Sequence, residues 1–183
     1  MAQAHLCTVL RLPVAKPVLL KTLDKNAETG LIVESISGEE MIAFRTTSAL
    51  HLMDRLVDLL GEGLGANLIY QMGKDMGQSM FDHLEDEVKS QHDLVNMMDT
   101  VLAERGWGRC RELERVKGVT YHVRTEGNPV SGRHATNEPM CHYIRGFYSG
   151  FLEGYRKKKV IHSKQLACKV LGAPYCTFEV TLE

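Results

Sequence analysis

Three cysteines in the C-terminal part of the chain have a spacing that could hold a metal ion. Cys168 and Cys176 flank a turn-like stretch at Gly172, so a hairpin would bring their side chains together. Cys141, at the start of the preceding predicted helix, could complete a triangle of thiolates. Zinc binds thiolate sulfur at about 2.3 Å and normally takes four ligands. The spacing predicts a structural zinc site on Cys141, Cys168 and Cys176, and buried apolar cysteines without metal are the competing interpretation.

A fourth ligand for this site is not evident from the spacing. His162 precedes Cys168 by six positions, which is about 20 Å along an extended strand. Cys110 could take part only if its strand lies beside the hairpin. The fourth position of the predicted zinc site therefore stays open.

Two predicted helices combine large apolar side chains with glycines spaced four apart, which are Gly73 and Gly77 in one and Gly146, Gly150 and Gly154 in the other. These glycine faces favour close packing of one helix on another, packing against a subunit partner, or contact with a flat ligand. We expect an internal apolar pocket between sheet and helices, covered by the loop 125–138 and lined by Met72, Met76, Trp107, Phe147 and Phe151. The alternative is that these residues simply fill a close-packed core.

Signatures of catalysis are missing from the sequence. No serine, histidine and acid stand at a recognisable spacing, and no glycine-rich loop ends in Lys-Ser or Lys-Thr. The run Gly61-x-Gly63-x-x-Ala66 follows a predicted helix rather than a strand, which favours a helix–helix corner over a dinucleotide site. We therefore expect a protein that is not an enzyme.

The elements that must position these residues follow from apolar periodicity. Helical spacing predicts helices over about 46–60, 64–81, 90–104 and 139–155. Alternation predicts two C-terminal hairpins, with strands over 107–116, 119–124, 159–168 and 175–182. Residues 1–45 are expected to form a β-hairpin extension, from Leu31–Val33 and Met41–Phe44, packed on a ligand-binding domain over 46–183.

Composition sets bounds on partners and compartment. The chain has 183 residues, 44% of them hydrophobic and 25% charged, with a formal net charge of −1. This near-neutral balance predicts no nucleic-acid partner, and the absence of a long apolar run predicts no membrane partner. An N-terminus without signal features and an odd number of cysteines, five, indicate a cytoplasmic protein with reduced thiols.

Five motifs, weaker toward the N-terminus, carry a resemblance to a known family over roughly 50–183. They are Tyr70-x-x-Gly73-x-x-x-Gly77, Gly106-Trp-Gly108, Asn137-Glu-Pro-Met-Cys141-His, Gly146-Phe-Tyr-Ser-Gly150-Phe and Cys168-x7-Cys176-x-Phe178. Together they resemble the vinyl-4-reductase family of small-molecule-binding domains. The resemblance implies an α/β (α+β) fold shared with transport-protein-particle (TRAPP) subunits, with helices on one face of a twisted antiparallel sheet, and a homodimer.

The resemblance also implies a site. In the sensor domains of aromatic-responsive transcriptional activators, a hydrophobic ligand sits beside a zinc held by three cysteines and a glutamate. The cysteines fall on Cys141, Cys168 and Cys176, and the glutamate falls on Gln165, a neutral and poor zinc ligand. Three thiolates with a water, with Cys110 or with a histidine remain as alternatives.

Three functions are compatible with these observations. The first is non-catalytic binding or sensing of a hydrophobic, hydrocarbon-like molecule, with output through a signalling partner protein or a change in the dimer, because the given chain carries no ATPase or DNA-binding module. The second is assembly or scaffolding, as in trafficking complexes. The third is assistance to the reduction of a tetrapyrrole vinyl group. The first is the principal hypothesis, supported by a methionine-rich helix that could repack around a guest.

Overall fold

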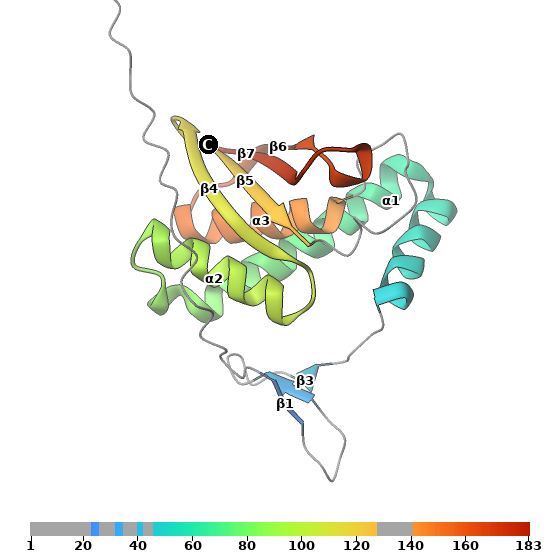
Figure 1. The fold of residues 1–183 in the computed structure, drawn as a ribbon, viewed down its shortest axis with the longest axis horizontal. Helices are drawn as coiled ribbons and strands as arrows, with labels where there is room; N and C mark the ends of the chain where they lie inside the picture. Colours follow the sequence, from blue (N-terminus) through green and yellow to red (C-terminus); the bar gives the residue numbers. More distant parts are fainter. Residues whose placement is uncertain (1–22, 26–31, 35–39, 42–45, 128–140) are drawn as a thin grey trace, which may run out of the picture.

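A computed structural model describes residues 23–25, 32–34, 40–41, 46–127 and 141–183. The helices are α1 (Thr46–Leu84), α2 (Gln91–Glu104) and α3 (His142–Arg156), with short 3-10 turns η1 (Glu85–Glu87) and η3 (Lys169–Leu171). The strands of the main sheet are β4 (Arg109–Lys117), β5 (Thr120–Glu126), β6 (Val160–Ala167) and β7 (Cys176–Leu182). Helices and a four-stranded antiparallel sheet confirm the expected α+β class (Figure 1).

The main sheet has the strand order β4-β5-β7-β6, and all neighbours are antiparallel. Its inner face is apolar because side chains alternate along each strand. On β7, Cys176, Phe178, Val180 and Leu182 are all buried, as their alternation predicts. α2 contacts β4, and α3 contacts β6 and β7. The core therefore lies between the sheet and these two helices.

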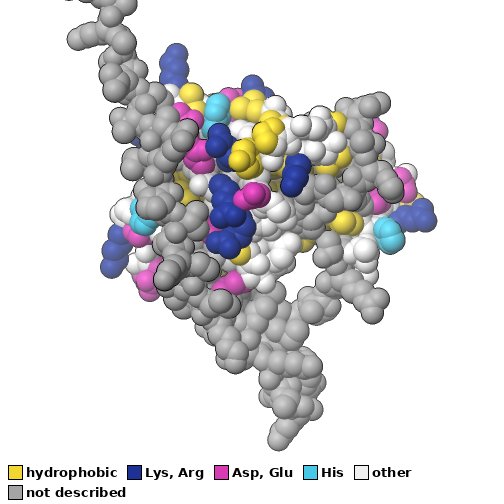
Figure 2. Space-filling model, in the orientation of Figure 1, with side chains coloured by type: hydrophobic (Ala, Val, Ile, Leu, Met, Phe, Trp, Pro, Cys, Tyr) yellow, Lys and Arg dark blue, Asp and Glu magenta, His cyan; other side chains and the backbone are white. Residues whose placement is uncertain are grey.

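The outer face of the sheet is polar. Arg124 on β5 pairs with Glu112 on β4 at 2.7 Å, and Glu179 on β7 lies within 3.0 Å of both His122 and Lys164. Figure 2 shows basic and acidic side chains interspersed on the face of the molecule seen in Figure 1. One face of the sheet thus carries the core, and the other carries charges.

The longest contact between helices is a seam along which α1 and α3 run parallel, and we call it the glycine seam after Gly73, Gly77, Gly146 and Gly150. A Cβ atom at Gly146 would overlap the carbonyl oxygen of Tyr70, and one at Gly150 would overlap that of Lys74. Beside the seam, Lys74 pairs with Glu153 at 2.8 Å. The two predicted glycine faces therefore pack on each other within one chain.

The break expected at Gly61 is present as a corner inside α1. Gly61 has φ +78° and ψ 159°, which are not helical values and which side chains other than glycine rarely adopt. A Cβ at Gly65 would touch the backbone of Leu56 and Val57, so the helix turns sharply there. The predicted helix–helix corner is correct, although the helical segments are continuous with it.

The N-terminal strands form a separate three-stranded antiparallel sheet of β1 (Leu23–Lys25), β2 (Ile32–Glu34) and β3 (Glu40–Met41). Ile32 pairs with Met41, as the predicted hairpin requires. The packing of residues 1–45 on the remaining chain stays a prediction, because most of them lie outside the described residues. Within the described parts of the chain, no helix has the length and apolarity needed to cross a membrane.

Candidate metal centre and ligand site

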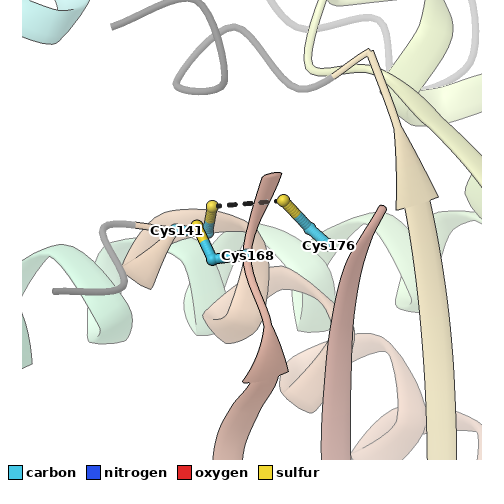
Figure 3. A group of neighbouring side chains, drawn as sticks. All are labelled: Cys141, Cys168 and Cys176. Carbon is cyan, nitrogen blue, oxygen red and sulfur yellow. Dashed lines mark hydrogen bonds between the residues drawn. The ribbon is translucent and has the colours of Figure 1, made fainter. Parts of the chain in front are cut away.

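The three predicted metal ligands meet at one end of the sheet. The Sγ atoms of Cys141, Cys168 and Cys176 all lie within 4.8 Å of one another, and Figure 3 shows the side chains turned toward a common point. The side chains are 1%, 2% and 1% exposed, and the thiols are free. We call this group the cysteine triangle.

Each cysteine of the triangle is placed by the end of an element. Cys141 is the residue before the first turn of α3, Cys168 precedes η3, and Cys176 begins β7. Gly172, with φ +91°, closes the turn between Cys168 and Cys176 in a conformation that favours glycine. Thr125 of β5 pairs with Cys176 in the sheet register, which fixes the position of β7.

The thiols of the triangle are electrostatically unlike one another. The Sγ atoms of Cys141 and Cys176 are 3.8 Å apart, a hydrogen-bond distance for sulfur. That bond, with burial, raises the pKa of Cys141, and it lowers the pKa of Cys176 to about 6. The backbone N–H of Lys169 also donates to the Cys176 sulfur at 3.5 Å. Cys176 is therefore the thiol that ionises first.

The geometry of the triangle fits a tetrahedral metal such as zinc. Two sulfurs bound at about 2.3 Å to one tetrahedral ion are about 3.8 Å apart, which matches the distance between Cys141 and Cys176. Buried thiolates are also the donors that soft and borderline ions prefer. Cys141, Cys168 and Cys176 would hold such an ion.

Gln165 lies at this site as the resemblance implied. It is on β6, its side chain forms a hydrogen bond with Cys141, and its Nε2 donates to the carbonyl of Ala167 at 3.1 Å. Neither alternative fourth donor joins the triangle, because Cys110 lies beside Tyr148 and no histidine of the described residues belongs to the group. The part of the chain that the structure describes supplies three donors.

The predicted pocket residues fall into two environments. Phe147 and Phe151 on α3 are 1% and 0% exposed, and their ring centroids are 5.5 Å apart. Phe151 also packs edge-on against Phe81 of α1 at 5.6 Å. In this conformation both phenylalanines are part of the filled core.

The other three residues lie nearer the surface. Trp107 is partly buried and stacks on Tyr143, with ring centroids 4.5 Å apart. Met76 is partly buried against the core, whereas Met72 is 42% exposed. The structure therefore does not bring all five residues to one surface, and the lining stays a prediction.

The loop predicted over 125–138 was wrong at its start. Thr125 and Glu126 belong to β5, and Thr125 is only 1% exposed. Residues 128–138 of the predicted loop lie outside the described residues. Thr125 continues the inward alternation of Tyr121 and Val123, so the period of two already contained this signal.

A buried polar group was missed in the sequence. The hydroxyls of Thr125 and Tyr148 are 2.6 Å apart, and Tyr148 also forms a hydrogen bond with Cys110. Burial raises the pKa of Cys110 to about 12 and keeps that thiol protonated. Only the inward parity of Thr125 pointed to this network, because its partners come from β4 and α3.

Comparison with known protein families identifies part of the chain. Residues 121–182 match the vinyl-4-reductase (4VR) domain. This match confirms the resemblance over β5, α3, β6 and β7, the segment that contains the whole cysteine triangle. No curated protein matches the chain by sequence.

Solved structures share the fold at low sequence identity. The phenol-responsive sensory domain of the transcription activator PoxR, solved with phenol, is 18% identical with a TM-score of 0.74, over 88% of this chain and 85% of that one. A vinyl-4-reductase family protein from Methanocaldococcus jannaschii is 20% identical with a TM-score of 0.51, over 81% and 87%. A trafficking protein particle complex subunit 3 from Naegleria fowleri, covalently bound to palmitic acid, is 15% identical with a TM-score of 0.51, over 76% and 97%.

Proposed function

We propose that this protein binds or senses a hydrophobic small molecule without catalysing its conversion. The observation that carries the proposal is the match to the vinyl-4-reductase domain over 121–182 together with the fold shared with the PoxR phenol-sensing domain. Partly buried aromatic and thioether side chains at Trp107, Tyr143 and Met76 give an apolar ligand matching contacts. Such a protein would act in the cytoplasm and pass its signal to a partner protein.

The proposed pocket is lined by Met72, Met76, Trp107, Phe147 and Phe151. Because Phe147 and Phe151 are closed off from solvent, a ligand would enter from the Trp107 side, and Met76 would repack to admit it. Ligand binding in this pocket therefore couples to the stacking of Trp107 on Tyr143.

The chain has a single tryptophan, so its fluorescence reports on this site alone. Titration with phenol, and separately with palmitic acid, should change Trp107 emission in a saturable way for one of the two. Trp107→Phe removes the signal, and mass spectrometry of a solvent extract of purified protein identifies a ligand already bound. A chain that carries no extractable organic molecule and gives a flat titration with both probes would refute the proposal.

We also propose one structural zinc per chain on the cysteine triangle, with a water as its fourth ligand. The matching sulfur separation and the burial of the thiols support it. Elemental analysis of gently purified protein, with and without a chelator, tests the proposal directly.

A homodimer is proposed as the functional unit. The glycine seam is occupied within the chain, so it is unavailable to a partner. A row at four-residue spacing on α1 remains exposed, in which Leu60, Leu64, Leu68 and Met72 are 41%, 60%, 39% and 42% exposed. A second copy could cover this row. Light scattering at micromolar concentration should give a dimer mass, and Leu64→Glu should give a monomer mass.

The fold shared with a trafficking-complex subunit favours assembly as the second candidate function. A large stable complex on purification from its native source, with no extractable ligand, would support that alternative. A spectral change with a tetrapyrrole and a reductant would support a role in vinyl reduction instead.

A further inference from the structure

The cysteine triangle offers three equivalent soft donors and no further one. Among the described residues, no carboxylate or imidazole joins the three sulfur atoms within their mutual distance of 4.8 Å. The nearby Gln165 is neutral, and its amide N–H is already donated to the carbonyl of Ala167. The residues that the structure describes therefore make a three-sulfur site, one donor short of the zinc preference for four.

Charge gives a second constraint on what this site holds. All three thiols are at most 2% exposed, and binding converts each of them to a thiolate. Three thiolates around a divalent ion leave one negative charge uncompensated in a buried position, which is costly. Lys169, which acts on Cys176, is itself exposed to solvent and so compensates weakly. A trivalent centre, in contrast, gives a neutral product.

We propose that Cys141, Cys168 and Cys176 bind a trivalent thiophilic metalloid of the arsenite class as a tris-thiolate. Arsenous acid would exchange its three hydroxyl groups for three sulfurs. Three As–S bonds form, three As–O and three S–H bonds break, three waters leave, and the oxidation state does not change. The lone pair of the trivalent centre occupies the fourth direction, so that no fourth ligand is needed. The inference rests on the proposed use of the triangle as a binding site.

The test uses the full chain, reduced and freed of metal, titrated with sodium arsenite. One arsenic per chain should bind, with the mass increase of one arsenic atom less three hydrogens in native mass spectrometry. Of the five cysteines, two should then remain reactive toward a thiol reagent after unfolding without reductant. A sulfur-to-arsenic absorption band should grow to the same endpoint.

Matched variants separate the triangle from the rest of the chain. Cys168→Ser leaves two thiols and should weaken arsenite binding at least tenfold, whereas Cys110→Ala, which removes an equally buried thiol outside the triangle, should leave it unchanged. Gln165→Glu adds a charged donor and should tighten zinc about tenfold while weakening arsenite. Because this last variant keeps all thiols, a folding defect in Cys168→Ser does not remove the test.

Two results would overturn the proposal. One is arsenite binding that leaves more than two thiols free, and the other is equal loss of binding in Cys110→Ala. Its failure is distinguishable from that of the proposed ligand-sensing function, because Trp107 fluorescence with phenol or palmitic acid is measured on metalloid-free protein. Protein that binds arsenite but purifies without zinc would refute the structural zinc alone.

Discussion

At the glycine seam the backbones of α1 and α3 touch, whereas at the cysteine triangle three side chains face one another across up to 4.8 Å. Both features use α3. Gly146 and Gly150 lie along its middle, and Cys141 immediately precedes its first turn. The seam has no space for even one added carbon atom, and the triangle has a space that suits one ion. The difference teaches that α3 is held in place by steric contact at one part so that chemistry can be placed accurately at another.

The largest expected effect is at the seam. Gly150→Leu places a side chain against the carbonyl oxygen and backbone of Lys74, which cannot move without shifting α1. We expect a loss of more than about 5 kcal/mol in the free energy of unfolding, beyond the range of ordinary substitutions. Urea unfolding followed by circular dichroism measures it. A mild effect would mean that the helices are not in backbone contact, and the contrast with the triangle would disappear.

The aromatic core beside the seam comes next. Phe151→Ala removes a fully buried ring that packs on Phe81 and Phe147. A loss of about 3–5 kcal/mol in the free energy of unfolding is expected for a close-packed site. A smaller loss, accompanied by altered binding of phenol or palmitic acid, would place ligand space next to Phe151 and extend the adaptable region into α3.

At the triangle, Cys176→Ala should abolish metal binding and lower stability by about 3 kcal/mol, the contribution of a ligand present at roughly 100 times its dissociation constant. Thermal melting with and without a chelator measures the effect. Chelator should lower the melting temperature of the wild type and leave that of Cys176→Ala unchanged. Cys110→Ala is the control, since its thiol is buried but lies outside the triangle. Equal chelator sensitivity in Cys176→Ala would contradict the assignment.

The smallest effect is expected where a glycine is helical but uncrowded. Nothing lies within 4 Å of a Cβ built at Gly63, and this residue is inside α1. Gly63→Ala should therefore stabilise the fold by about 0.5–1 kcal/mol through lower entropy of the unfolded chain. The same urea experiment measures it. Destabilisation here would show that glycine is needed for a reason other than the steric one seen at the seam.

Much of the fold follows from local pattern. Ser90 caps α2 where the helical spacing begins, and the buried side of β7 follows strict alternation. The triangle was also predictable, because a hairpin at Gly172 and a helix start at Cys141 are local features that bring three thiols together.

Other features depend on contacts that sequence periodicity does not encode. Glycine spacing predicted that two helix faces could pack closely, but a subunit or a ligand would have satisfied the same pattern. The hydrogen bond between Thr125 and Tyr148 needs the relative placement of β5 and α3. The exposure of Met72 was likewise missed, since the helical period assigns it to an apolar face without saying what covers that face.

The parallel direction of the glycine seam has a consequence for the kinetics of folding. Two parallel neighbours cannot be joined by a short turn, and Gly73 and Tyr143 are in contact although about 70 positions separate them. During synthesis α1 leaves the ribosome long before its partner exists. Its glycine face and apolar row must then stay exposed until α3 arrives. Closing the seam is thus a late, non-local event, and α1 is the part of the newly made chain that most needs protection from aggregation.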